Sequence, residues 1–243
     1  MAQPKYDVIF QELRKRIEAG SIGFQELLPS ENTLAREFVC TRNTVRKAIA
    51  LLVTQGFVQT MQGRGAQVIY RRHPASVFMV GGIESMREAA ERNRIPVSTH
   101  MISLDRTTVD ADLASRSGMS QGARVTVVRR LRLLDGVPLI VDTSCFLSAV
   151  VPDLTQEIVE SSVYAYLEHE LGVNVASATR TMTVERASDE DRQFLHLAGM
   201  DCVAVITSTT FDSSGTLFEY TSSRHSPVHF EFQATAHRLP QNR

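Results

Sequence analysis

Apolar residues recur at helical spacing in three separate stretches near the beginning of the chain. Within residues 5–20, apolar side chains recur every three or four positions, and this spacing predicts an amphipathic helix. A second helix is expected after Ser30, a favourable N-cap preceded by Pro29, and a third between Thr41 and Gly56. The residues expected to be buried between these helices are Tyr6, Ile9, Leu13, Ile17, Leu34, Ala35, Phe38, Val45, Ala48, Ile49 and Leu52.

Two extended runs follow the third helix. Residues 57–61 and 66–70 are rich in β-forming residues and flank the sequence QGRG, which predicts a hairpin with glycines and one cation at its tip. Two short helices followed by a hairpin with a basic tip are typical of a winged helix-turn-helix. We therefore expect this part of the chain to bind DNA.

The residue types at the start of the third helix fit contacts with bases and phosphates. Arg42 and Arg46 can read guanine with two hydrogen bonds, and Asn43 can read adenine. The hydroxyls of Thr41 and Thr44, at a helix N-terminus, can hold phosphate. Arginines on a helix face are also common on an ordinary solvated surface. Their combination with the hairpin tip favours the DNA interpretation.

Charge is distributed unevenly along the chain. Residues 1–72 hold 11 Lys and Arg against 6 Asp and Glu, a net of +5, whereas residues 73–243 hold 15 against 21, a net of −6. The basic part coincides with the predicted winged helix-turn-helix, as expected of a DNA-binding domain. The three cysteines are widely spaced, and the sequence has neither a membrane-length apolar run nor a signal-peptide pattern. We therefore expect a soluble, cytoplasmic protein.

The remainder of the chain alternates helix and strand patterns. Hairpin signals between the strands predict a mainly antiparallel sheet with helices on one side, an α+β fold. We expect a DNA-binding domain at 1–70, a linker at 71–76 and a second domain at 77–243. The expected helices are 84–94, 155–171 and a short one after Ser188 that Asp191 caps, and the expected strands are 97–106, 124–134, 137–146, 173–184, 201–211, 217–223 and 229–237.

Arg130 and Arg132 are the strongest candidates for ligand binding in the second domain. Strand alternation places both guanidinium groups on one face of the sheet, where they suit a phosphate or carboxylate. The alternative is an exposed arginine pair with no ligand. His196 and His225 lack the spacing of a metal site, so we expect no metal. Side chains that could hydrogen-bond sugar hydroxyls are Asp142, Ser162, Tyr164 and Glu219.

The segments LPSE, TRNTVRKA and QGRG resemble the DNA-binding module of the GntR family of bacterial regulators. Asn32 stands where many members have Arg. The resemblance implies operator contacts from Thr41, Arg42, Asn43, Thr44 and Arg46, and from Gln62, Gly63 and Arg64 at the wing.

The resemblance continues through the second domain. RLRLLDGVP is similar to the ligand-sensing (UTRA) domain of HutC-type members, whose fold is like that of chorismate lyase. VPDLTQEIVESSVYAYLEHELG, SDEDRQFL and LFEYTSSRH resemble the trehalose-operon repressors of low-GC Gram-positive bacteria. The similarity implies release from DNA by trehalose 6-phosphate, with no other cofactor. It assigns Arg130, Arg132, Ser162 and Ser85 to the phosphate and Asp142, Tyr164, Glu219 and His225 to the sugar, with His225 where many relatives have Tyr.

Two alternatives remain at this stage. The second domain could sense another anion, such as an amino sugar phosphate or a urocanate-like acid. It could also be a lyase-like enzyme attached to a DNA-binding module, but the sequence has no nucleophile–base pair at a recognisable spacing, so we expect no enzymatic activity. Because one recognition helix covers half an operator site, we expect a homodimer on a palindromic operator.

Overall fold

The structure, a computed structural model, describes residues 4–71, 78–79, 83, 85–228 and 230–233. Contacts divide the chain into two units. Most of the first unit is Met1–Pro74, and most of the second is Ile83–Glu231. The expected linker at 71–76 lies outside the described residues except for Arg71. The expected boundaries therefore stay a prediction.

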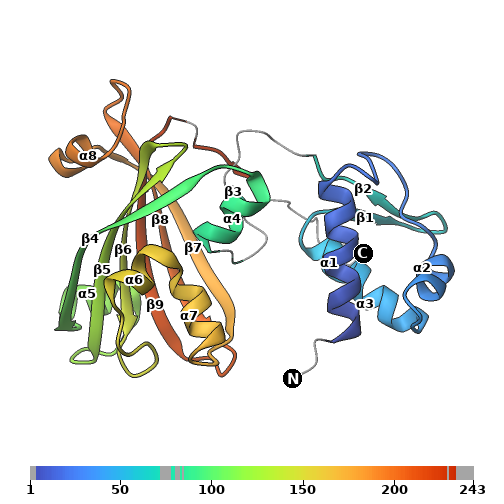
Figure 1. Cartoon of the computed structure of the whole chain (residues 1–243), viewed down its shortest axis with the longest axis horizontal. Coiled ribbons are helices and arrows are strands. Elements are labelled where there is room, and N and C mark those ends of the chain that lie inside the picture. The colour runs from blue at the N-terminus through green and yellow to red at the C-terminus, as the bar shows by residue number, and fades with distance from the viewer. Residues whose placement is uncertain (1–3, 72–77, 80–82, 84, 229, 234–243) are drawn as a thin grey trace, which may run out of the picture. The chain divides into compact units, whose positions relative to one another are not determined.

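The first unit contains the three helices and the hairpin that the sequence predicts. The hydroxyls of Ser30 and Thr41 accept hydrogen bonds from the backbone N–H groups of Thr33 and Thr44, both at 3.2 Å, and so cap the second and third helices. Gly56 ends the third helix with a φ of +75°. The elements, drawn in Figure 1, are α1 Lys5–Glu18, α2 Glu31–Glu37, α3 Arg42–Thr54, β1 Val58–Met61 and β2 Gly65–Val68.

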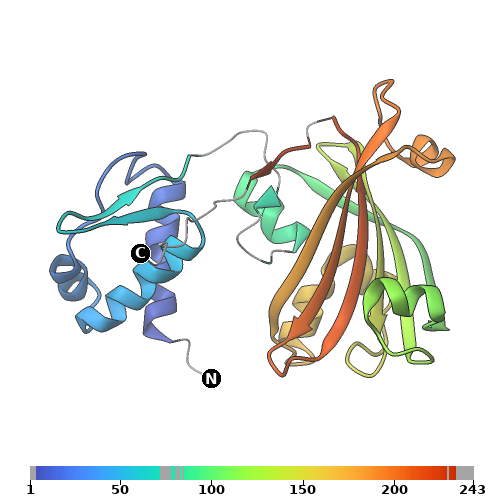
Figure 2. The same cartoon turned by 180° about the vertical axis from the view of Figure 1, so that it is seen from behind.

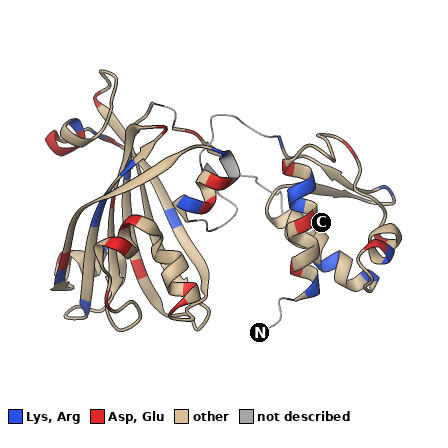
Figure 3. Ribbon diagram, in the orientation of Figure 1, with Lys and Arg blue, Asp and Glu red and all other residues tan. Residues whose placement is uncertain are grey.

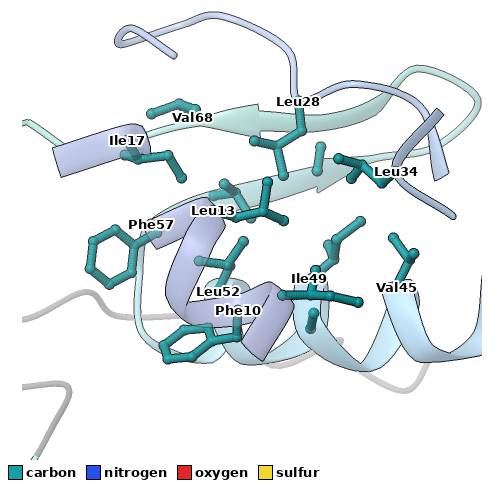
Figure 4. Close-up of a cluster of buried hydrophobic side chains, with 14 residues drawn as sticks. Phe10, Leu13, Ile17, Leu28, Leu34, Val45, Ile49, Leu52, Phe57 and Val68 are labelled. Atoms are coloured by element: carbon teal, nitrogen blue, oxygen red, sulfur yellow. The ribbon is translucent and has the colours of Figure 1, made fainter. Parts of the chain in front are cut away.

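A cluster of buried apolar side chains joins the three helices to the hairpin (Figure 4). Leu13 of α1, Leu34 of α2, Leu52 of α3 and Phe57 before β1 are fully buried. Burying a side chain of this size contributes about 1.5–3 kcal/mol, so the cluster fixes α3 with its polar face outward. Tyr6, expected in the core, is only half-buried, and its ring lies 5.9 Å from the Lys47 ammonium.

The second unit is built on a six-stranded antiparallel sheet with the order β4-β5-β6-β9-β8-β7 (Figures 1 and 2). Strand β9 therefore lies in the middle of the sheet, beside β6, although more than sixty residues separate them in the sequence. The strands are β4 Val97–Thr108, β5 Arg124–Leu134, β6 Val137–Leu147, β7 Val175–Arg186, β8 Cys202–Asp212 and β9 Leu217–His225.

Helices cover both faces of this sheet, not one face as expected. Helices α6 and α7 pack against the face that includes Val128 and Phe146. Helices α5 and α8 pack against the opposite face, which includes Val141 and Cys145 (Figures 1 and 2). The sequence did not reveal α5 because its seven residues are too few for a clear helical period. The helices of this unit are α4 Met86–Asn93, α5 Ala111–Ser117, α6 Gln156–Ser161, α7 Val163–His169 and α8 Asp189–Phe194.

The single helix expected at 155–171 is instead two helices separated by Ser162. This residue has an extended backbone, with φ −155° and ψ 109°, and its hydroxyl accepts the backbone N–H of Ala165 at 3.2 Å. A serine hydroxyl offers the backbone an alternative to helical hydrogen bonds. The break therefore follows from local chemistry that apolar periodicity does not report.

The two ends of the range expected for the second domain, 77–243, match the prediction less completely, and residues from Phe232 onward belong to the first unit. Helix α4 begins after the N-cap Ser85 and lies within the expected range of 84–94. Of the expected strand at 229–237, the structure has β10, Phe232–Gln233, which pairs with β3, Phe78–Met79. Residues 229 and 234–237 lie outside the described residues.

Asp191 supports α8 in the capping box that the sequence predicts. Its carboxylate accepts hydrogen bonds from the backbone N–H and hydroxyl of Ser188, both at 2.8 Å. It also accepts two from the Arg224 guanidinium, at 2.8 and 2.9 Å. Burial would raise the pKa of Asp191, but these hydrogen bonds lower it below its ordinary value. Asp191 thus joins α8 to β9 as a carboxylate.

We predict that Asp191→Ala lowers the free energy of unfolding by about 2 kcal/mol at pH 7, because charged hydrogen bonds are lost. Since the folded pKa is lowered, this stabilisation is present above the ordinary aspartate pKa of about 4 and is lost as the pH falls through the folded pKa. Urea unfolding at several pH values measures both effects. Glu190→Ala, at an exposed ion pair with Arg129, is the control and should cost under about 1 kcal/mol. Equal costs for the two variants would contradict the role of Asp191.

Candidate DNA interface and effector site

The residues proposed to read DNA lie together at the N-terminal end of α3. Thr41 is the N-cap, and Arg42, Asn43 and Arg46 are exposed in the first turns. Thr44 is half-buried, and its hydroxyl lies 2.9 Å from that of Thr41. The structure therefore brings these five residues onto one accessible end of a helix that the core holds in place.

Glu31 of α2 contacts both arginines of this surface. Its carboxylate accepts Arg46 Nε at 2.9 and 3.1 Å and Arg42 Nη2 at 3.3 Å. These hydrogen bonds, the one from Arg46 most of all, lower the pKa of Glu31. The sequence suggested only a helix-dipole role for Glu31, since no local pattern links positions eleven and fifteen residues apart. The carboxylate thus orients two exposed guanidinium groups at the N-terminal end of α3.

The wing residues are exposed at the tip of the hairpin. Gly63 and Gly65 have φ angles of +72° and +104°, which favour glycine, and a side chain on either would meet no atom within 4 Å. Backbone geometry, not space, therefore requires glycine here. Gln62 and Arg64 project from this turn, and Figure 3 marks the basic residues of the first unit.

The second candidate site is a row of polar side chains across the sheet face that α6 and α7 cover. The strand register places Arg130 of β5 beside Asp142 of β6, and Asp142 beside Ser223 of β9. Alternation puts the other members on the same face. The row consists of Arg130, Arg132, Asp142, Ser144, Glu219, Thr221, Ser223 and His225.

Asp142 pairs with both arginines at the centre of this row. Arg132 Nε donates to its carboxylate, Arg130 Nη2 lies 3.9 Å from it, and the Ser223 hydroxyl donates at 2.5 Å. Burial alone would raise the pKa of Asp142, but the two guanidinium groups and the hydroxyl lower it below its ordinary value. Arg132 also donates to the Thr99 hydroxyl at 3.2 Å. Asp142 is thus a fixed anion between two cations.

Arg130 is incompletely satisfied by these contacts. It is 6% exposed, and its Nη2 donates to the Ser144 hydroxyl at 2.8 Å. Its Nε is buried and has no hydrogen-bond partner among the described residues. Burial, and then the charge of Arg132, lowers the pKa of Arg130 to about 10. A guanidinium in this state can still accept an anionic ligand as an additional partner.

A chain of hydroxyls links Arg130 to the acidic end of the row. The Ser144 hydroxyl lies 3.0 Å from that of Thr221, which in turn donates to Glu219 at 3.0 Å. The Tyr164 hydroxyl of α7 donates to the other carboxylate oxygen of Glu219 at 2.7 Å. Burial, and then Glu219, raises the pKa of Tyr164, so the phenol stays protonated as a donor. The row therefore has a cationic end and a carboxylate end.

His225 lies at one end of the row and is almost fully buried. Burial lowers its pKa to about 4, opposed in part by Asp142, so the imidazole is neutral at pH 7. Its ring centroid lies 5.2 Å from that of Phe230. The structure thus brings His225 to the same sheet face as Asp142.

Ser85 and Ser162 are both helix N-caps in the structure. The Ser85 hydroxyl accepts the backbone N–H of Glu88 at 3.2 Å, and the Glu88 carboxylate completes a capping box. Among the described residues, no hydrogen bond joins Ser85 or Ser162 to Arg130 or Arg132. Each hydroxyl proton remains available for donation, because a capping hydroxyl acts as an acceptor.

A cavity of about 680 Å3 adjoins this row. It lies between α4, the start of β4 and the end of α6, and it reaches Arg132 and Thr99. Cavities that bind small molecules have volumes of about 300–1,000 Å3. Three further side chains of this region, Ser144, Thr99 and Thr221, were not among the predicted site residues. The first of these lies two residues after Asp142, and the last two residues after Glu219, so strand alternation alone could have identified both.

Comparisons with known proteins identify the domain in each unit. Residues 5–68 match the description "Bacterial regulatory proteins, gntR family", and residues 93–231 match "UTRA domain". The HTH-type transcriptional regulator TreR of Bacillus subtilis (strain 168) is 33% identical over 236 residues, covering 96% of this chain and 98% of its own. The HTH-type transcriptional repressor NagR of the same organism is 25% identical, with coverage of 93% and 94%.

Solved structures give the same fold. YydK of Bacillus subtilis matches 97% of this chain and 100% of its own with a TM-score of 0.80 at 22% identity. The effector-binding domain of the Bacillus subtilis trehalose repressor TreR matches 59% of this chain and 99% of its own, with a TM-score of 0.53 at 32% identity. No helix in the described part of the chain is long and apolar enough to cross a membrane.

These relatives are named as regulators or repressors, not as enzymes, and the helix-turn-helix implies binding to operator DNA. The chain belongs to the GntR family and is a transcriptional regulator with a C-terminal UTRA domain.

Proposed function

We propose that this protein is a cytoplasmic, homodimeric repressor of a sugar-utilisation operon, for trehalose, and that trehalose 6-phosphate releases it from its operator. The observation that carries this proposal is the buried pair Arg130 and Arg132, in which Arg130 Nε has no hydrogen-bond partner among the described residues. A phosphate oxygen is a suitable acceptor for it. Similarity to TreR over 96% of the chain supports a trehalose-derived ligand.

The polar row has the chemistry that a sugar phosphate requires. Its cationic end binds the phosphate, and the carboxylate of Glu219 with the Tyr164 hydroxyl binds sugar hydroxyls at the other end. Asp142 contacts both arginines, so a hydroxyl bound to it would lie close to the phosphate. Ser162 and Ser85 donate to the phosphate through their free hydroxyl protons. His225, as a neutral imidazole, accepts or donates one further hydrogen bond.

An amino sugar phosphate is the second candidate effector. The buried carboxylate of Glu219, 4% exposed, would bind an ammonium group as readily as hydroxyls. Glucosamine 6-phosphate and trehalose 6-phosphate share the phosphate but differ at this end of the row. Direct titration with both therefore discriminates between the two assignments.

Release follows if the effector prefers the arrangement of the dimer that does not fit the operator. A ligand shifts such an equilibrium only by its difference in affinity for the two arrangements. The coupling is reciprocal: if the effector weakens operator binding by a certain factor, operator DNA should weaken effector binding by the same factor.

We predict that the protein is a homodimer and binds a palindromic operator as one dimer per site. One chain has a mass of 27.0 kDa. Sedimentation velocity at concentrations that saturate operator binding should give twice this mass. A monomer with full specific affinity would contradict this assignment.

We predict that Arg42→Ala and Arg46→Ala each cost about 1–3 kcal/mol of specific DNA affinity and weaken discrimination at one base pair. Arg64→Ala should weaken specific and random DNA more evenly and reduce the salt dependence of binding, because a wing arginine mainly contacts phosphate. Binding isotherms on operator and random duplexes at several salt concentrations measure both. Operator binding that is nearly unchanged in the Arg42→Ala/Arg46→Ala variant would exclude α3 as the recognition helix.

We predict that Arg130→Ala and Arg132→Ala weaken trehalose 6-phosphate binding by about 1.5–3 kcal/mol per lost charged hydrogen bond. Operator affinity without effector should change little, because both residues lie in the second unit. Calorimetry and operator-release titrations with trehalose 6-phosphate, trehalose and glucosamine 6-phosphate measure this.

Arg129→Ala is the matched control, because Arg129 lies on the same strand but on the opposite face and pairs with Glu190. It should keep wild-type affinity for the effector. If Arg129→Ala, Arg130→Ala and Arg132→Ala are all released from the operator at the same concentration of trehalose 6-phosphate as wild type, the arginine pair does not bind the phosphate.

A further inference from the structure

Five charged side chains line the cavity between α4, β4 and α6. Arg87 and Glu91 form an ion pair one turn apart on α4, at 3.1 Å. Glu160 accepts a backbone N–H of β4 at 2.9 Å, and Arg132 pairs with the buried aspartate described above. The fifth is Arg94, for which the described residues supply no ion pair or side-chain hydrogen bond. It is an exposed guanidinium at the edge of a cavity that reaches the arginine pair.

The backbone of Arg94 is in a conformation that favours glycine. Arg94 follows the last residue of α4 and has φ +56° and ψ +38°, the left-handed region. Helices commonly end in this way, with glycine or sometimes asparagine at that position, because a Cβ atom there is strained. An arginine therefore occupies a position where local backbone energetics favour a smaller residue. Strained residues of this kind cluster at ligand-binding sites.

The charged groups of the polar row balance one another, so an anionic ligand bound beside them would need a further cation. Arg130 and Arg132 are balanced by Asp142 and Glu219, all four being part of one sheet face. A phosphomonoester brings a charge of about −1.5 to −2 at pH 7. Binding it in this partly buried place would leave an excess of negative charge, which is costly away from water. A third guanidinium beside the arginine pair removes that excess.

We propose that Arg94 binds the anionic group of the effector from the C-terminal end of α4, in the cavity that Arg132 also lines. This inference rests on the proposed function, since it adds a ligand to the same effector site. Ala89 is the only side chain of α4 that is buried among those described, so few apolar contacts hold the helix in place. A phosphate between Arg94 and Arg132 would join α4 to the sheet, which makes the C-terminal end of α4 part of the response to effector.

The test compares Arg94→Gly with wild type and with Arg87→Ala. Glycine removes the guanidinium and relieves the left-handed backbone, so the variant should melt no lower than wild type without ligand. Calorimetry with trehalose 6-phosphate should show a loss of affinity of about tenfold or more, the effect of one charge-assisted hydrogen bond. Arg87→Ala, whose guanidinium already has a partner on α4, should stay within about twofold of wild type.

Inorganic phosphate provides a second readout that does not depend on the sugar. It should raise the melting temperature of wild type and of Arg87→Ala more than that of Arg94→Gly. If trehalose 6-phosphate binds wild type and Arg94→Gly equally, the role of Arg94 is wrong and the proposed effector stands. If trehalose 6-phosphate does not bind wild type, but inorganic phosphate stabilises wild type more than Arg94→Gly, Arg94 binds an anion and trehalose 6-phosphate is the wrong effector. If neither ligand stabilises wild type, both proposals are wrong.

Discussion

A charge that is removed from water needs a partner of opposite sign, and the polar face of the second unit depends on this constraint. Arg130 and Arg132 can be buried side by side only because the register of β5 and β6 places Asp142 between them. The same aspartate holds Ser223 of β9. Hydrogen bonds and ion pairs to Asp142 thus tie three strands together on this sheet face. Among the described residues, the Nε of Arg130 still has no hydrogen-bond partner.

The first unit uses the same pairing at its surface, with a different result. Glu31 binds Arg42 and Arg46, but all three side chains are substantially exposed to water. An exposed ion pair contributes little to stability, about 0–1 kcal/mol, so another anion can replace the carboxylate at low cost. The buried cluster therefore holds its charged groups in fixed positions, whereas the exposed arginines of the surface cluster can exchange partners at low cost.

Local patterns predicted most of the helices and strands, because caps and alternation are written in neighbouring residues. Ser30, Thr41 and Ser188 cap helices as expected, and the span of β5 agrees with its predicted range. Local patterns do not predict which distant segments pair with each other. The contact of Glu31 with Arg46 and the relay from Ser144 to Thr221 depend on how separate elements pack. Helix α5 was too short to show a period, and the break at Ser162 replaces backbone hydrogen bonds with a side-chain one.

The central position of β9 bears on the order in which the two activities arise during synthesis. Glu219, Thr221 and Ser223 complete the polar row only when β9 lies beside β6, and long-range pairing of this kind forms late in folding. The DNA-reading helix-turn-helix is made first from the N-terminal part of the chain and has a core of its own. A nascent or truncated chain that ends before residue 217 would therefore carry the complete helix-turn-helix without the polar row, and under the proposed function no effector could release it from DNA.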